Sequence, residues 1–199
     1  EFVARERHCR IDAAERTAIS AIVDDFRARQ ERARHLCPPR DLQRLRSQNK
    51  LLPRERVSRL LDRGSDFLEL SALAGLAMHD DDGKKSVQGG GSIVGIGTVS
   101  GKRVVISASD SAVKGGTIAP MGLKKALRAQ AIALENKLPL VALVESGGAN
   151  LMYQAEIFVD GGRTFANQAR LSAAGIPQIA VVHGSSTAGG AYLPGLSDV

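Results

Sequence analysis

PLVALVESGGA at residues 139–149 and QIAVVHGSSTAGGA at residues 178–191 follow the same pattern. Each begins with a short apolar run, residues 139–144 or 178–182, which leads to a Gly-Gly pair and then to a helix-forming segment. Strands that are apolar throughout are covered on both faces, as in layered α/β proteins. The two stretches therefore predict an α/β fold with repeated β-β-α units.

The neighbouring segments fit this layout. Residues 93–99 and 103–109 are β-rich and are joined by Ser100-Gly101, a link that favours a hairpin. Apolar residues recur at helical spacing over residues 123–136, and residues 163–174 are also predicted to be helical. Buried strands thus alternate with helices through the second half of the chain.

The first part of the chain has a different character. Residues 11–34 are rich in arginine and predict a helix, because their apolar side chains lie three or four residues apart: Ile11, Ala14, Ala18, Ile22 and Phe26. Cys37-Pro38-Pro39 should end this helix, since a residue before proline is driven out of the helical conformation. A second helix is predicted over residues 53–61, and residues 79–85 are interpreted as a charged surface loop. We expect a helical leader over residues 1–47 and one main domain over residues 48–199.

Composition excludes several classes of protein. Hydrophobic residues make up 43% of the 199, which is ordinary for a folded domain. No apolar run approaches the roughly 18 residues that a membrane span needs, so no membrane contact is expected. The start of the chain mixes arginine with acidic residues and fits neither a signal peptide nor a transit peptide. Because the sequence stops directly after a strand-and-turn pattern, we expect it to be a fragment of a longer protein.

Charge and cysteine content narrow the choice of ligand. The net charge of +6 attracts anions, and the absence of tryptophan leaves little for stacking nucleic-acid bases. We therefore expect no nucleic-acid partner, whereas a nucleotide of the coenzyme A (CoA) type suits the charge. Cys9 and Cys37 have no second cysteine or histidine at metal-ligand spacing, so no metal site is predicted.

The two Gly-Gly pairs are the strongest candidates for chemistry. They follow the carboxyl ends of strands, where ligands bind in α/β folds. Glycine lets a ligand approach the backbone and leaves peptide N–H groups available at the start of a helix. Two such donors aimed at a thioester oxygen would stabilise an enolate. The alternative is a tight strand-to-helix turn that binds nothing.

Two titratable residues lie near these turns. His183 ends an apolar run and is either a packed or capping residue or, less often, a general base. Glu145 precedes the first Gly-Gly pair, where it could orient a loop or act as an acid, but no second carboxylate follows it in residues 146–150. The sequence also lacks the GxxxxGK[ST] phosphate loop and the G-x-S-x-G nucleophile elbow.

Ordered motifs from Lys50 to the end of the chain resemble one family. They are KLLPRERV at 50–57, LDRGSDFLEL at 61–70, DSAVKGGT at 110–117, LKKALRAQ at 123–130, VESGGA at 144–149 and GSSTAGGAYLP at 184–194. Together they are similar to the carboxyltransferase (beta) subunits of biotin-dependent acyl-CoA carboxylases. The KGGT and TAGGAY segments look most like the methylcrotonoyl-CoA type.

The resemblance implies a crotonase-like fold, truncated here, and a reaction. In that family CO2 moves from carboxybiotin to an acyl-CoA carbon, so the protein supplies positioning and oxyanion holes rather than a side-chain base. Implied partners are an acyl-CoA substrate, a biotin carboxylase or biotin carrier subunit that holds the biotin cofactor, and further copies of the chain. Implied locations are the bacterial cytoplasm or, in a eukaryote, the mitochondrial matrix.

The resemblance also assigns roles to individual residues. Gly189 and Gly190 are the candidates for the acyl-CoA oxyanion hole, and Ala191 contributes a further amide. The acyl-CoA is expected to lie along Ser146, Gly147, Gly148, Ala149, Gly115 and Gly116, with Lys114, Lys124, Lys125 and Arg128 near its phosphates. Residues 150–153, Ser186 and His183 depart from the usual family pattern and bear on the acyl preference.

Two other functions stay open at this point. A crotonase-type hydratase or isomerase would use the same fold but would need a carboxylate beside the oxyanion hole, for which Glu145 is the candidate. A non-catalytic CoA-binding subunit is the other alternative.

Overall fold

A computed structural model describes residues 12–35, 37, 39–78 and 87–199. The chain divides into two compact units, residues 1–35 and residues 36–199. The first contains helix α1 (Ala13–His35), on which Ile22 and Phe26 are exposed and Arg29 pairs with Asp25 at 2.7 Å. The predicted helix is thus confirmed from Ala13 onward, whereas Ile11 lies outside the described residues. The expected leader boundary at residue 47 stays a prediction.

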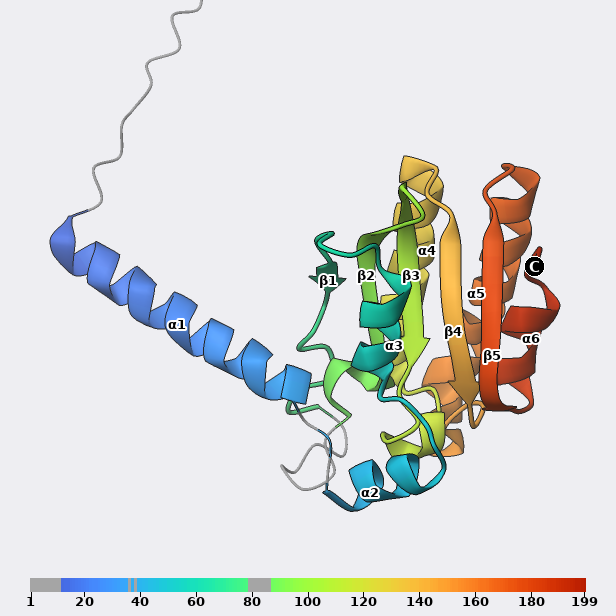
Figure 1. Ribbon diagram of the computed structural model, residues 1–199, viewed down its shortest axis with the longest axis horizontal. Helices are drawn as coiled ribbons and strands as arrows, with labels where there is room; N and C mark the ends of the chain where they lie inside the picture. The colour runs from blue at the N-terminus through green and yellow to red at the C-terminus, as the bar shows by residue number, and fades with distance from the viewer. Residues whose placement is uncertain (1–11, 36, 38, 79–86) are drawn as a thin grey trace, which may run out of the picture. The chain divides into compact units, whose positions relative to one another are not determined.

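The second unit is built on a five-stranded sheet in the order β1-β2-β3-β4-β5. The strands are β1 (Leu68–Leu70), β2 (Ser92–Val99), β3 (Lys102–Ser109), β4 (Leu140–Ser146) and β5 (Gln178–Ser186). The first three pair antiparallel, and β4 and β5 continue parallel to β3. Figure 1 shows the sheet with helices on both faces. The predicted α/β layering is confirmed.

The hairpin between β2 and β3 has the predicted link. Ser100 and Gly101 both have positive φ, 50° and 72°, as a two-residue turn that matches the strand twist requires. The carboxylate of Asp62 accepts hydrogen bonds from both amides, each at 2.7 Å. The turn is therefore fixed both by its own residues and by a distant side chain.

Two hydrophobic clusters hold the layers together. On one face α4 (Pro120–Asn136) and α5 (Gln154–Ala173) pack over a cluster that includes Val105 and Ala142. On the other face α3 (Pro53–Leu60) covers a cluster that includes Ile106 and Leu143. Strand β4 contributes to both clusters, and all seven of its residues are buried. For residues 140–144 the unbroken apolar run predicts this burial.

The remaining elements are short helices and turns. They are α2 (Pro39–Ser47), α6 (Gly189–Gly195) and the 3-10 turns η1 (Gln88–Gly91), η2 (Lys114–Gly116) and η3 (Leu151–Tyr153). β2, β3 and α4 form one β-β-α unit, and β4–α5 and β5–α6 follow it as strand–helix units.

Several predicted boundaries differ from the structure. Helix α5 begins at Gln154 rather than at residue 163. Gly161 and Gly162 lower the helix propensity of its first half, so the sequence does not indicate a helix there. Strand β5 runs to Ser186 rather than to residue 182. Helix α2 was not predicted, since Leu45 is its only buried residue. The predicted loop at residues 79–85 lies outside the described residues.

The close approach of α4 to η1 gives a first test. A Cβ on Gly122 would lie 2.2 Å from the carbonyl oxygen of Gly90, and backbone atoms cannot rotate away. We expect Gly122→Ala to lower the free energy of unfolding by about 3 kcal/mol in urea titrations. Gly161→Ala is the control: nothing lies within 4 Å of its Cβ position. That variant should instead gain about 0.5–1 kcal/mol, because alanine favours the helix. Equal effects of the two substitutions would contradict the packing described.

Candidate functional site

Three glycine turns meet at the edge of the sheet where the parallel strands end. The first turn, residues 114–117, follows β3; the second, residues 146–149, follows β4; and the third, residues 187–190, follows β5. Carboxyl ends of parallel strands share one edge, which is the usual ligand-binding edge of such sheets. The predicted residues of all three segments are therefore brought together.

Ser146 joins the three turns. Its carbonyl oxygen accepts a hydrogen bond from the amide of Thr187 at 3.0 Å, and its hydroxyl lies 3.4 Å from the carbonyl oxygen of Gly116. The same hydroxyl accepts a hydrogen bond from the amide of Gly148 at 3.1 Å. With 7% of its surface exposed, Ser146 is a buried junction rather than a surface nucleophile.

Close packing explains the glycines. A Cβ on Gly116 would lie 2.7 Å from the carbonyl oxygen of Glu145, and one on Gly190 would lie 2.5 Å from the hydroxyl of Ser146. Gly148 has a φ of +80°, which other residues rarely adopt. The three turns can pack against each other only because these positions have no side chain.

The amides of the third turn differ in whether they already donate a hydrogen bond to a protein group. The amide of Gly190 donates to the carbonyl oxygen of Thr187 at 2.9 Å, and that of Ala191 donates to Ala188 at 3.0 Å. The amide of Gly189 makes no hydrogen bond within the part of the chain that the structure describes. Ala188, just before it, holds a positive φ of 47°. Of the three predicted donors, only Gly189 thus offers an unoccupied N–H.

The second turn offers one comparable donor. The amide of Gly147 donates to Gly116 at 3.2 Å. The amide of Ala149 has no hydrogen-bond partner among the described residues. This turn contacts the third turn, because a Cβ on Gly148 would lie 3.3 Å from the carbonyl oxygen of Thr187.

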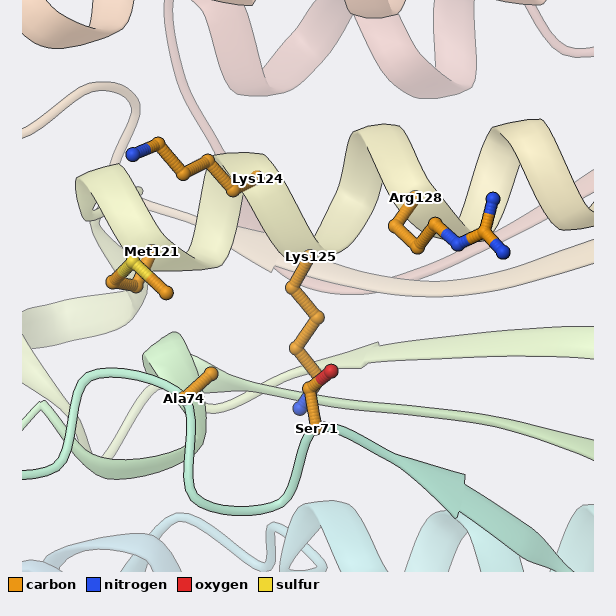
Figure 2. Close-up of a pocket in the computed structure, with 6 residues that line it drawn as sticks. All are labelled: Ser71, Ala74, Met121, Lys124, Lys125 and Arg128. Atoms are coloured by element: carbon orange, nitrogen blue, oxygen red, sulfur yellow. The ribbon is translucent and has the colours of Figure 1, made fainter.

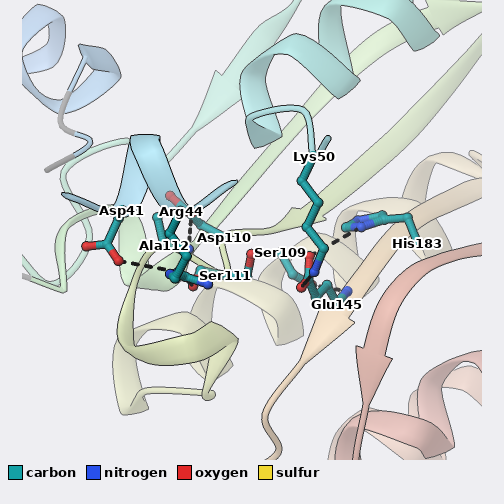
Figure 3. Close-up of polar contacts among 9 residues, drawn as sticks. All are labelled: Asp41, Arg44, Lys50, Ser109, Asp110, Ser111, Ala112, Glu145 and His183. Atoms are coloured by element: carbon teal, nitrogen blue, oxygen red, sulfur yellow. Dashed lines mark hydrogen bonds and ion pairs between the residues drawn. The ribbon is translucent and has the colours of Figure 1, made fainter. Parts of the chain in front are cut away.

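Glu145 and His183 belong to a partly buried polar cluster beside the turns (Figure 3). The ammonium nitrogen of Lys50 lies 2.5 Å from Glu145 Oε1, and His183 Nδ1 lies 3.5 Å from Glu145 Oε2. Burial pushes the pKa of the Glu145 carboxyl upward, but hydrogen bonding and the charge of Lys50 outweigh it and hold the pKa below its usual value. Burial lowers the pKa of His183, and the charge of Arg56 lowers it further. The cluster thus favours an ionised Glu145 and a neutral His183.

A second set of contacts fixes residues 110–112, which lead into the first turn. Arg44 on α2 donates to the carbonyl oxygen of Ser111 at 3.2 Å and pairs with Asp41 at 3.3 Å (Figure 3). Asp110 accepts a hydrogen bond from the amide of Ala112 at 2.9 Å, and burial raises its pKa. Neither Arg44 nor Lys50 was predicted to take part, since each is distant in sequence from the turns it supports.

A cationic pocket of about 270 Å³ lies beside α4. Figure 2 shows its lining: Ser71 and Ala74 from the loop after β1, and Met121, Lys124, Lys125 and Arg128 from α4. Lys124 is exposed, and Arg128 lies 3.7 Å from Glu135 with both side chains more than 60% exposed. Of the cations predicted to lie near the phosphates, Lys124 and Arg128 line this pocket. Lys114 instead belongs to the first glycine turn.

Lys125 differs from its neighbours. Its ammonium group is buried and donates to the carbonyl oxygens of Gly89 and Ser92, at 3.1 and 2.7 Å. Burial lowers the pKa of this ammonium to about 8. The sequence suggested a phosphate contact for Lys125, but these bonds make it a support for η1.

Within residues 12–35, 37, 39–78 and 87–199, no cluster of three or more His, Cys, Asp or Glu side chains is placed to hold a metal ion. None of the helices there is long and apolar enough to cross a membrane.

The buried ammonium of Lys125 predicts a pH effect on stability. The unfolded chain keeps this proton up to about pH 10.5 but the folded protein releases it near pH 8, so the unfolded state binds more protons between these values. Stability should therefore rise with pH in that window, by roughly 2–4 kcal/mol from this group. Urea unfolding at the two ends of the window should give a smaller rise for Lys125→Met than for the parent. Lys124→Met, which removes an exposed ammonium, should keep the parent slope; an unchanged slope in Lys125→Met would refute the assignment.

Similarity to known sequences extends over most of the chain. The model of the carboxyl transferase domain family matches residues 44–199. The chain is 55% identical over 160 residues to a probable mitochondrial methylcrotonoyl-CoA carboxylase beta chain of Drosophila melanogaster, covering 79% of this chain and 27% of that protein. It is 58% identical over 155 residues to a biotin-dependent 3-methylcrotonyl-coenzyme A carboxylase beta1 subunit of Mycobacterium tuberculosis, covering 76% of this chain and 28% of that protein. The chain thus spans little more than a quarter of the length of these relatives.

Solved structures agree with the sequence comparison. The beta subunit of geranyl-CoA carboxylase from P. aeruginosa superposes with a TM-score of 0.82 at 53% identity, covering 100% of this chain and 37% of that one. Transcarboxylase 12S, solved as a hexamer with hydrolysed methylmalonyl-coenzyme A bound, gives a TM-score of 0.81 at 27% identity over 90% of this chain and 36% of that one. These likenesses confirm the predicted crotonase-like fold. The chain belongs to the carboxyl transferase domain family.

Proposed function

We propose that this chain is part of the carboxyltransferase subunit of a biotin-dependent acyl-CoA carboxylase that acts on methylcrotonoyl-CoA or a related acyl-CoA. The CO2 and the acceptor for the substrate proton come from carboxybiotin on a partner subunit. The residues of this chain bind the acyl-CoA and stabilise the charge that develops on its thioester oxygen. The names of the Drosophila and Mycobacterium relatives support the choice of acyl-CoA.

The observation that carries the proposal is the amide of Gly189, which donates no hydrogen bond to any of the residues that the structure describes. It lies at the ligand-binding edge of the sheet, at the first position of α6, where helical geometry leaves an N–H without a partner. The Ala149 amide on the contacting second turn is a second available donor. Preorganised donors of this kind stabilise an enolate oxygen without needing a charged side chain. Gly190 and Ala191 then shape the turn rather than donate to the substrate.

The surroundings of Glu145 disfavour the hydratase alternative. That chemistry needs a carboxylate that is available to the substrate, whereas Glu145 is buried and paired with Lys50 at 2.5 Å. A carboxyltransferase needs no such base from this chain. The arrangement of the cluster therefore supports carboxyl transfer.

The cationic pocket suits the phosphates of CoA. Lys124 and Arg128 lie one helical turn apart on α4. Just before this helix, Ile118 pairs with Ala149 of the second glycine turn. Phosphate groups bind well to such cations. We assign this pocket to the phosphate end of the acyl-CoA and the glycine turns to its thioester end.

The wider setting is part of the same proposal. Residues 48–199 form the acyl-CoA-binding domain, which assembles with further copies of the chain and with a subunit that carries biotin. The hexamer described for transcarboxylase 12S supports such an assembly. A mitochondrial location in eukaryotes follows the naming of the Drosophila relative, and a bacterial protein would be cytoplasmic.

Removing the amide of Gly189 tests the mechanism. In the full-length enzyme, assembled with its biotin-bearing partner and assayed on methylcrotonoyl-, propionyl- and geranyl-CoA, we expect at least one substrate to be carboxylated. Gly189→Pro, which lacks the N–H, should lower kcat by about 100- to 1000-fold. Gly189→Ala keeps the N–H, and nothing lies within 4 Å of its Cβ position, so it should stay active.

Two outcomes would count against this account. Failure of the parent on all three acyl-CoAs would favour a non-catalytic CoA-binding subunit. Equal activity of Gly189→Pro and Gly189→Ala, with the fold intact by circular dichroism, would remove Gly189 from the mechanism.

The pocket gives a separate kinetic signature. Lys124→Ala and Arg128→Ala remove charges that meet the CoA phosphates, so each should raise KM for the acyl-CoA by about 5- to 20-fold with little change in kcat. Raising the salt concentration should shrink the difference. Arg103→Ala, on the exposed start of β3, is the matched control and should leave KM unchanged. An unaltered KM in both pocket variants would place the phosphates elsewhere.

A further inference from the structure

Lys50 and Glu145 form a partly buried ion pair between distant parts of the chain. Lys50 lies between α2 and α3, and Glu145 is the residue of β4 immediately before Ser146. Their side chains meet at 2.5 Å and are 25% and 9% exposed (Figure 3). The pair therefore links the segment before α3 to the start of the second glycine turn.

Contacts with both neighbouring strands and with the first turn restrict the position of Glu145. Its amide lies 3.4 Å from the hydroxyl of Ser109 on β3. A Cβ at position 184 on β5 would lie 2.5 Å from Glu145 Cδ, so Gly184 leaves room for the carboxylate. Its carbonyl oxygen packs against Gly116 of the first turn. Glu145 is thus held by both neighbouring strands, one turn and the charge of Lys50.

Stability alone does not account for this pair. Replacing a buried ion pair by apolar residues is often neutral or stabilising, because removing two charges from water is costly. Glu145 Oε2 and both ring nitrogens of His183 also lack hydrogen-bond partners among the described residues. A further charged group near Glu145 is the guanidinium of Arg56. The pair instead provides a short, directional contact at one position of the chain, Glu145.

The position of Glu145 affects the third turn through Ser146. Glu145 is bonded to Ser146, whose carbonyl oxygen holds the amide of Thr187 at 3.0 Å. The Ser146 hydroxyl also packs where Gly190 has no side chain. A shift of Glu145 would therefore move the junction of the turns and, through it, the amide of Gly189.

We propose that the Lys50–Glu145 ion pair is a positioning device that sets the second glycine turn, and through Ser146 the third, in register for catalysis. The inference rests on the proposed function. Lys50 and Glu145 do not touch the substrate; they act through Ser146. Misplacement of a reacting group by about 1 Å can cost about 100-fold in rate, so a small relaxation is enough to be measured.

A pair of neutral substitutions separates positioning from stability. In the assembled full-length enzyme, Lys50→Met and Glu145→Gln should each lower Tm, since each leaves a buried group without its partner. The double variant should recover most of the lost Tm. Its kcat should nevertheless stay about 10- to 100-fold below that of the parent, with KM almost unchanged, because the phosphate pocket is intact.

Hydrogen exchange supplies a readout that does not depend on activity. The protected amides of Thr187 and Gly190 should exchange about tenfold faster in the double variant than in the parent. The control is the double variant Arg54→Met with Glu69→Gln, which removes another ion pair, at 2.8 Å, with a buried carboxylate on β1. It should change neither kcat nor exchange in the third turn.

Recovery of both Tm and parental kcat in the Lys50/Glu145 double variant, with unchanged exchange, would overturn the positioning role. A parent enzyme that carboxylates none of the acyl-CoAs would overturn the proposed function instead. In that case faster exchange in the double variant would still support positioning, and unchanged exchange would overturn it as well.

Discussion

The approach of three backbone turns to Ser146 is the constraint on which the site depends. Its carbonyl oxygen accepts a hydrogen bond from the amide of Thr187, and its hydroxyl lies 3.4 Å from the carbonyl oxygen of Gly116 and fills the space that Gly190 leaves by lacking a side chain. The carboxyl ends of β3, β4 and β5 come together at one edge because the strands are parallel, and the turns can close over that edge only with glycine. The availability of each amide follows from this packing. The amide of Gly190 donates within the turn, while that of Gly189 has no hydrogen-bond partner in the described part of the chain.

Apart from the exposed Lys114 of the first turn, the protein places its charges around this edge and leaves the contacts between the turns to backbone groups and Ser146. On the α3 side, the partly buried Lys50–Glu145 pair adjoins the second turn. Along α4, Lys124 and Arg128 form a cationic pocket suited to phosphates. Such a division fits a reaction in which negative charge appears on a substrate oxygen, because fixed dipoles stabilise that charge without having to reorganise. Binding strength and transition-state stabilisation would then reside in different parts of the chain.

Local features of the sequence predicted the elements that form the edge. The apolar runs leading to β4 and β5, the Gly-Gly pairs and the Ser100-Gly101 hairpin each contain their own signal within a few residues. The sharing of one pocket by Lys124 and Arg128 also follows from their helical spacing. Features that join distant residues could not be predicted. Lys50 and Glu145 are 95 positions apart, and the occupation of the Gly190 amide depends on how tightly the third turn closes. Helix α2 was missed because it buries one side chain and derives its support from Arg44 contacting Ser111.

The central claim is that the Gly189 amide binds the thioester oxygen of an acyl-CoA. A structure of the assembled full-length enzyme with a non-reactive acyl-CoA analogue bound would test it most directly. The account predicts the thioester oxygen at about 3 Å from the Gly189 nitrogen, with the CoA phosphates beside Lys124 and Arg128. A thioester bound away from the third turn, with the Gly189 N–H donating to another protein group or to water alone, would contradict it.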